Sequence, residues 1–171
     1  LHNVKNALAA AAAAAALGVS GEAVERGLGQ FGGAGRRFEY KGSFRGAEIY
    51  DDYAHHPGEL KALLDAAHTL GYQRVICAFQ PHTYTRTAAL FDDFVEVLKQ
   101  PDVALLAEIY AARETNDIGI SSKDLAARIP GARYCATLPE VTAALRELAR
   151  PGDLILTVGA GDIYTAGEAL V

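Results

Sequence analysis

The sequence predicts an α/β fold, with a mostly parallel sheet that carries helices on both faces. Beyond residue 37, short apolar strands alternate with helices of about 10 to 14 residues, which is the pattern of parallel strands joined by helical crossovers. The predicted strands are also nearly continuous apolar runs, which is typical of strands covered on both faces. The chain has 171 residues, of which 50% are hydrophobic, so it is large enough to bury such a core.

The N-terminal part of the chain predicts two helices. Residues 3–17 are mostly alanine and other strong helix formers, so they predict a helix that Gly18 ends. Ser20 predicts the N-cap of a second helix, which runs to residue 31. The next segment, FGGAGR (31–36), holds three glycines in six residues and predicts a hinge or a domain boundary.

The following elements are predicted in order along the rest of the chain. A β-hairpin is expected over 37–53, with its turn inside the sequence KGSFRG. Four more strands are expected over 74–79, 103–109, 132–136 and 153–158. Helices are expected near 57–70, 87–99, 121–129 and 138–149, and after Gly161. Local signals that support these bounds are the cap formed by Ser121, Ser122 and Asp124 and the turn PGD at 151–153.

Composition excludes several classes of function. The net charge is −5 and the chain has no basic run, which argues against nucleic acid as a partner. No apolar stretch approaches the roughly 18 residues of a membrane helix, so no membrane insertion is expected. Cys77 and Cys135 lie in apolar strand segments and predict buried thiols, as in a reducing cytoplasm. The chain has no methionine and begins Leu-His-Asn, so we expect it to be part of a longer protein.

Polar side chains follow four of the predicted strands at their carboxyl ends. Because the carboxyl ends of parallel strands meet at one edge of a sheet, these segments are expected to form one ligand-binding rim. The four segments are DDYAHH (51–56), QPHTYTR (80–86), YAARETND (110–117) and GAGD (159–162).

The first of these segments is open to two interpretations. Asp51 and Asp52 either belong to the site or cap the following helix. His55 and His56 precede Pro57, which suits the first position of a helix, so either imidazole could serve the site or bond the helix end.

The other segments also have alternatives. His82, Tyr84 and Arg86 alternate along a stretch expected to be extended, so they would project to one side and clamp a carboxylate or phosphate. Otherwise Arg86 is a surface ion-pair partner. GAGD either turns backbone N–H groups toward an anion or is a simple tight turn, because the full GxGxxG is absent. No lysine follows a glycine, so a reaction that consumes ATP needs its phosphate-binding lysine from elsewhere.

Seven blocks, in this order, resemble the C-terminal third of the Mur ligases, and within that family the branch that joins L-alanine to UDP-N-acetylmuramate. They are HNVKNALAA (2–10), GRRFE (35–39), DDYAHHP (51–57), QPHTYTRT (80–87), IYAARE (109–114), SSKDLA (121–126) and TVGAGDIYTAGEAL (157–170). The resemblance implies a Rossmann-like C-terminal domain over 34–171, preceded over 1–33 by a short helical remnant of the central ATPase domain. It also implies a bacterial, cytoplasmic, ATP-dependent amide ligase of peptidoglycan precursor synthesis that works through an acyl phosphate. Mg²⁺ would be bound mainly by the upstream central domain.

The resemblance also implies roles for residues on the nucleotide side. Asn3 and Asn6 match residues that face the adenosine of ATP. Arg37 and Asp52 match the pair that the C-terminal domain brings to ATP on closure, and Tyr53 accompanies them. A guanidinium suits phosphate oxygens and a carboxylate suits ribose hydroxyls, so the chemistry of the pair agrees with these roles.

Three residues match the side that faces the amino acid. They are His55, which would also be catalytic, together with His82 and Arg86. Some relatives carry a second arginine where this chain has Thr83, so here the carboxylate of L-alanine would rely on Arg86.

Several alternatives stay open at this point. One is a sister Mur ligase that attaches recycled tripeptide to the same muramate. Another is a stand-alone nucleotide-binding module, and a third is a metal hydrolase. The fragment itself is expected to be inactive without the upstream domains. The metal ligands of the hydrolase alternative would be Asp51, Asp52, His55, His56 and His82.

Overall fold

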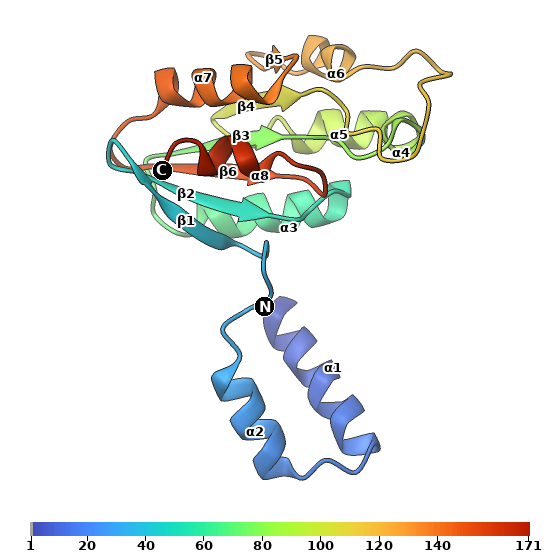
Figure 1. Cartoon of the computed structure of the whole chain (residues 1–171), viewed down its shortest axis with the longest axis vertical. Coiled ribbons are helices and arrows are strands. Elements are labelled where there is room, and N and C mark those ends of the chain that lie inside the picture. Colours follow the sequence, from blue (N-terminus) through green and yellow to red (C-terminus); the bar gives the residue numbers. More distant parts are fainter. Residues whose placement is uncertain (1) are drawn as a thin grey trace. The chain divides into compact units, whose positions relative to one another are not determined.

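The computed structural model describes residues 2–171, with side chains from residue 4 onward, as two compact units divided between residues 34 and 35. The first unit is a pair of helices, α1 (His2–Ala16) and α2 (Gly21–Gln30) (Figure 1). As predicted, α1 ends before Gly18, which has a φ of 79°, and Ser20 caps α2 by accepting a hydrogen bond from the N–H of Ala23 at 3.3 Å.

The second unit is built on a six-stranded sheet in the order β1-β2-β6-β3-β4-β5 (Figure 1). All neighbouring strands pair in parallel except β1, the antiparallel edge strand. The α/β fold and the mostly parallel sheet are therefore confirmed. The strands are β1 (Glu39–Phe44), β2 (Ala47–Asp52), β3 (Arg74–Phe79), β4 (Val103–Ala107), β5 (Arg133–Cys135) and β6 (Asp153–Val158).

The predicted hairpin is formed by β1 and β2. Its turn is made by Arg45 and Gly46, both with positive φ (51° and 81°), and such turns match the twist of paired strands. The register shifts between Tyr40 and Gly42, so β1 carries a bulge. Asp51 and Asp52 were expected after the strand, but they lie within β2, where the ladder to β6 extends to Asp52 and Val158.

Helices cover both faces of the sheet, as predicted (Figure 1). Side chains of β3 alternate between the two faces: Val75 and Phe79 pack on the side of α3 and α5, and Ile76 on the side of α7 and α8. The helices of this unit are α3 (Pro57–His68), α4 (Tyr84–Ala89), α5 (Phe91–Val97), α6 (Ser122–Arg128), α7 (Leu138–Leu148) and α8 (Tyr164–Glu168).

The strand order places a switch point at β6. The chain passes from β2 to β3 over one position of the sheet, continues outward to β4 and β5, and returns as β6 between β2 and β3. Ligands of such sheets bind at the carboxyl ends of the strands beside a switch point. A ligand-binding site is therefore expected at the segments that follow β2, β3 and β6.

The helix predicted over 87–99 is wrong in its bounds. It begins three residues earlier and is broken at Leu90, which gives α4 and α5. Thr83 turns the chain with a φ of 69°, and the carboxylate of Glu114 accepts hydrogen bonds from the N–H and the hydroxyl of Thr85 at 2.9 and 2.5 Å. Glu114 thus supplies an acceptor for a backbone N–H group in the first turn of α4, which has no partner within the helix. The helix can therefore begin there. No helix among residues 2–171 is long and apolar enough to cross a bilayer.

Candidate functional site

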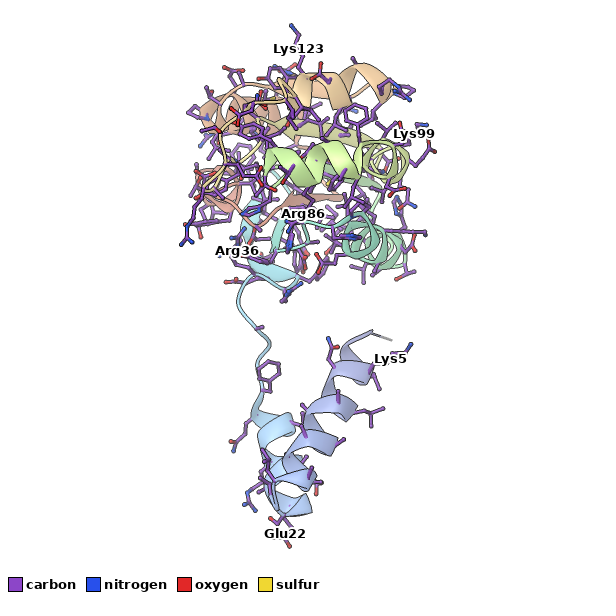
Figure 2. All side chains as sticks on the ribbon, turned by 90° about the vertical axis from the view of Figure 1, so that its right-hand side faces the viewer. Lys5, Glu22, Arg36, Arg86, Lys99 and Lys123 are labelled. Atoms are coloured by element: carbon purple, nitrogen blue, oxygen red, sulfur yellow. The ribbon has the colours of Figure 1, made fainter. Side chains whose placement is uncertain are left out.

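The predicted rim is present, because β2, β6, β3 and β4 are neighbours in the sheet and point the same way. Figure 2 looks onto their carboxyl ends, where Arg36 and Arg86 both lie. The loops are tied together by the backbone: Gly159 N–H donates to the carbonyl of Asp52 at 3.0 Å, and Thr83 N–H donates to that of Tyr110 at 2.9 Å.

Asp51 is fully buried and forms an ion pair with Arg36. The Nε atom of Arg36 donates to Oδ2 of Asp51 at 2.7 Å, and the hydroxyl of Thr157 donates to Oδ1 at 2.9 Å. The two terminal nitrogens of Arg36 donate to the carbonyl oxygens of Gly161 and Gly159, at 3.0 and 2.6 Å. Asp51 therefore holds a structural arginine rather than facing a ligand.

Asp52 lies beside this pair and holds the backbone around it. Its two carboxylate oxygens accept hydrogen bonds from the N–H groups of Phe38 and Ala54, each at 2.8 Å. Burial raises the pKa of Asp52, since the side chain is only 8% exposed, and the hydrogen bonds from Ala54 and Phe38 and the charge of Arg37 act against that rise. Each carboxylate oxygen keeps a second lone pair for a ligand hydroxyl.

Arg37 is exposed, in contrast to its neighbour Arg36. Its guanidinium carbon lies 5.7 Å from the ring centroid of Tyr53, which is 36% exposed. Arg37, Asp52 and Tyr53, three of the residues predicted on the nucleotide side, thus lie together. The other two are in the first unit: the side chain of Asn3 is outside the described residues, and Asn6 is exposed on α1, so their roles stay predictions.

A row of aromatic rings crosses the rim from the loop after β2 to the end of β4. The ring centroids are 5.5 Å apart from Tyr53 to His55, 6.0 Å from His55 to His82, and 5.6 Å from His82 to Tyr110. Arg86 joins the row, with a terminal nitrogen 3.5 Å from Nδ1 of His82. The predicted amino-acid residues His55, His82 and Arg86 are therefore adjacent.

The extended conformation predicted for residues 82–86 is wrong. Tyr84 and Arg86 lie in α4 and not on an extended stretch, so His82, Tyr84 and Arg86 do not project to one side by alternation. His82 and Arg86 meet because they are four residues apart around the first turn of α4. Burial lowers the pKa of His82, and the charges of Arg86 and His55 lower it further, so its neutral form is favoured.

Two other sequence features have structural explanations. His56 is the N-cap of α3, where its Nδ1 accepts the N–H of Gly58 at 3.2 Å. The segment 159–162 is a tight turn whose carbonyl oxygens face Arg36, rather than a loop that presents N–H groups to an anion. The carboxylate of Asp51 is paired with Arg36 and accepts a hydrogen bond from Thr157. Among residues 4–171, no group of three His, Cys, Asp or Glu side chains is placed to hold a metal ion.

Three residues of the rim were not singled out as site residues from the sequence. Besides Arg36, they are Gln80, whose side chain bonds Asp162 at 2.9 Å, and Glu108. Burial acts to raise the pKa of Glu108, but the hydrogen bonds it accepts from Ser121, Tyr134 and the N–H groups of Ile109 and Ser122 outweigh it, so the pKa is lowered. A charged residue that closes an apolar strand, as in VALLAE, was the available signal for Glu108.

The chain is similar to known proteins over almost its whole length. A model of the Mur ligase family, described as the glutamate ligase domain, matches residues 36–161. The UDP-N-acetylmuramate–L-alanine ligases of Agathobacter rectalis and Acetivibrio thermocellus are 49% and 45% identical over 99% and 98% of this chain. Among solved structures, the UDP-N-acetylmuramate-alanine ligase of Thermotoga maritima is similar with a TM-score of 0.74 and 28% identity over 99% of the chain. A murein peptide ligase of Psychrobacter arcticus has a TM-score of 0.71 and 25% identity over the whole chain.

This chain spans only part of those proteins. It covers 38% of the Agathobacter rectalis relative, 37% of the Acetivibrio thermocellus relative and of the Thermotoga maritima structure, and 38% of the Psychrobacter arcticus structure. The family model nevertheless matches most of the chain. The matched residues, 36–161, include Arg37, Asp52, His55, His82 and Arg86. The chain belongs to the Mur ligase family.

Proposed function

We propose that this chain is the C-terminal part of an ATP-dependent ligase that joins L-alanine to UDP-N-acetylmuramate in the bacterial cytoplasm, during peptidoglycan precursor synthesis. In this proposal residues 1–33 are the last helices of a central ATPase domain, and 34–171 are the domain that receives the amino acid. The observation that carries the proposal is the rim itself. It places Arg37, Asp52 and Tyr53 beside His55, His82 and Arg86.

The nucleotide side of the rim suits a transferring phosphoryl group. In the proposed reaction the muramate carboxylate takes the γ-phosphoryl group of ATP, and the amine of L-alanine then attacks the acyl phosphate and displaces phosphate. Arg37 is exposed and offers a planar fork of donors to phosphate oxygens, which neutralises charge during transfer. Asp52 is held rigidly by two backbone N–H groups, so its free lone pairs can orient a ribose hydroxyl.

The amino-acid side of the rim suits a small zwitterion. Arg86 would bind the carboxylate of L-alanine, and Thr83 leaves it without a second arginine at this position. His55 and His82 flank the place where the amine would lie, and His55 would assist the attack. The methyl group of alanine contributes only about 1–3 kcal/mol of discrimination over glycine, so larger amino acids must be excluded by shape.

Mg²⁺ is not assigned to this chain. Asp51 is paired with Arg36, and among residues 4–171 no group of three His, Cys, Asp or Glu side chains is placed to hold a metal ion. We therefore assign Mg²⁺, with the phosphate-binding lysine, to the upstream domains of the same protein. ATP would reach the rim only when these domains close over it.

The test is phosphate release by the full-length protein with ATP, Mg²⁺ and UDP-N-acetylmuramate. L-alanine, glycine, L-serine and the recycled tripeptide are compared as acceptors. Release that depends on L-alanine supports the proposal. Release only with the tripeptide would identify the sister ligase. The tripeptide is tested because the chain is also similar to a murein peptide ligase. No release with any acceptor would overturn the assignment.

A further inference from the structure

Two neighbouring arginines of the GRRFE segment have opposite environments. The side chain of Arg36 is 23% exposed, and its three guanidinium nitrogens all donate within the protein, to Asp51 and to the carbonyl oxygens of Gly159 and Gly161. Arg37 is exposed and points its guanidinium toward the ring of Tyr53. All three guanidinium nitrogens of Arg36 are therefore engaged inside the protein. Of the two arginines, only Arg37 has a guanidinium that is exposed for binding a ligand.

The backbone on both sides of Arg37 is held in an unusual conformation. Arg36 has a φ of 58° and Phe38 has a φ of 50°, in the left-handed region that is strained for a residue other than glycine. Phe38 is fixed by its N–H bond to Asp52 and by the stacking of its ring on Tyr50, with 4.5 Å between centroids. Arg36 is fixed by its guanidinium. Arg37 thus lies between two anchored residues that set its direction.

Arg36 also holds a second residue of the nucleotide side. Its carbonyl oxygen accepts the N–H of Tyr53 at 2.7 Å. Its guanidinium lies over the rings of both Tyr53 and Tyr164, 5.0 and 4.7 Å from their centroids. A planar guanidinium can stack flat on such rings, whereas an ammonium meets them only as a point charge. One side chain therefore connects the GRRFE segment, the loop after β2 and the turn after β6.

We propose that Arg36 is a positioning residue of the ligase reaction, which holds Arg37 in the arrangement that meets the nucleotide and touches no ligand itself. This inference rests on the proposed function. Its consequence is specific: replacing Arg36 slows the reaction through Arg37, so the effect disappears once Arg37 is gone.

Arg36→Lys is the variant of choice, made in the full-length protein. Lysine keeps a positive charge beside Asp51 but lacks the fork that reaches three acceptors. The matched control is Arg74→Lys. Arg74 pairs with buried Asp153 at 2.6 and 2.9 Å, donates to the carbonyl of Leu148 at 3.0 Å, and is 25% exposed, but lies at the amino ends of the strands.

The two lysine variants are expected to lower the melting temperature to a similar degree, whereas only Arg36→Lys lowers kcat, by about tenfold or more. A cycle with Arg37→Ala completes the test. The double variant Arg36→Lys with Arg37→Ala is expected to turn over as fast as Arg37→Ala alone, because positioning has no effect without the positioned group.

Two results would overturn the proposal. One is an equal kcat for Arg36→Lys and Arg74→Lys, which would make Arg36 purely structural. The other is an additive loss in the double variant. If Arg36→Lys does not fold, Tyr164→Leu removes one stacking face, keeps the ion pair and enters the same cycle. Absence of L-alanine-dependent phosphate release by the unaltered protein is a separate outcome, which removes the proposed function first.

Discussion

The imidazole rings of His55 and His82 lie side by side on the loops after β2 and β3, tilted by 55° to one another, with 6.0 Å between their centroids. Nδ1 of His55 lies 3.0 Å from the carbonyl oxygen of Tyr53, which can only accept, so this nitrogen donates. Nδ1 of His82 lies 3.5 Å from the guanidinium of Arg86, which can only donate, so this nitrogen accepts. In their neutral forms the rings therefore offer opposite Nε2 groups, an acceptor from His55 and a donor from His82.

Arg37→Ala and Asp52→Asn are expected to lower the kcat of the full-length protein by orders of magnitude, because each removes a group that we propose contacts the nucleotide. Asparagine is chosen at position 52 because its carbonyl oxygen can still accept one of the two backbone hydrogen bonds, whereas Asp52→Ala would leave the N–H groups of both Phe38 and Ala54 without an acceptor, at a cost of about 1–3 kcal/mol each. Steady-state turnover is measured beside circular dichroism of each variant. Near-normal turnover in either one would show that its residue was assigned wrongly.

Arg86→Ala is expected to raise the KM for L-alanine far more than it changes kcat, because it removes the cation proposed to bind the carboxylate. Arg128→Ala is the control, since Arg128 pairs with exposed Asp92 at 3.4 Å at the far end of α6. The KM values for ATP and L-alanine are measured separately. A rise in the KM for ATP alone would place Arg86 on the nucleotide side.

The strand ends were predictable wherever burial is continuous. Both β3 and β6 have the bounds predicted from sequence, because apolar runs covered on two faces stop where the chain reaches solvent. The rim followed from the same argument, since parallel strands end together. The roles assigned to its residues stay predictions.

Long-range contacts explain what the sequence did not predict. The insertion of β6 between β2 and β3 pairs residues that are far apart in the chain, such as Arg74 and Asp153. The start of α4 depends on Glu114, and the inward turn of Arg36 depends on the carbonyl of Gly159. No local pattern carries such information, because the partner is defined only by the fold.

The stability of the 171-residue chain is expected to fall on mild acidification, in part through His82. Burial, Arg86 and His55 lower the pKa of His82 below its ordinary value of 6.5. Between the lowered pKa and the ordinary one, the unfolded chain binds more protons than the folded chain, so stability rises with pH. This contribution is complete above about pH 6.5 and is lost as pH falls through the lowered pKa. The melting temperature of His82→Asn should depend less on pH below 6.5 than that of the unaltered chain, and identical slopes would contradict the prediction.

Gly161→Ala tests how tightly the rim is packed. A Cβ atom on Gly161 would meet the side-chain oxygen of Gln80 and would lie 2.7 Å from Cγ of Tyr110, so the ring of Tyr110 must move. We expect a loss of about 1–3 kcal/mol in the free energy of unfolding. Gly58→Ala is the control in the same unit, because its Cβ would make only an ordinary contact with His56, at 3.6 Å. Because Tyr110 stacks on His82 at 5.6 Å, the His82 ring resonances should shift in Gly161→Ala and stay in place in Gly58→Ala. Equal stability of the two variants would mean that the ring of Tyr110 moves without an energetic cost. The row of aromatic rings would then not be rigid.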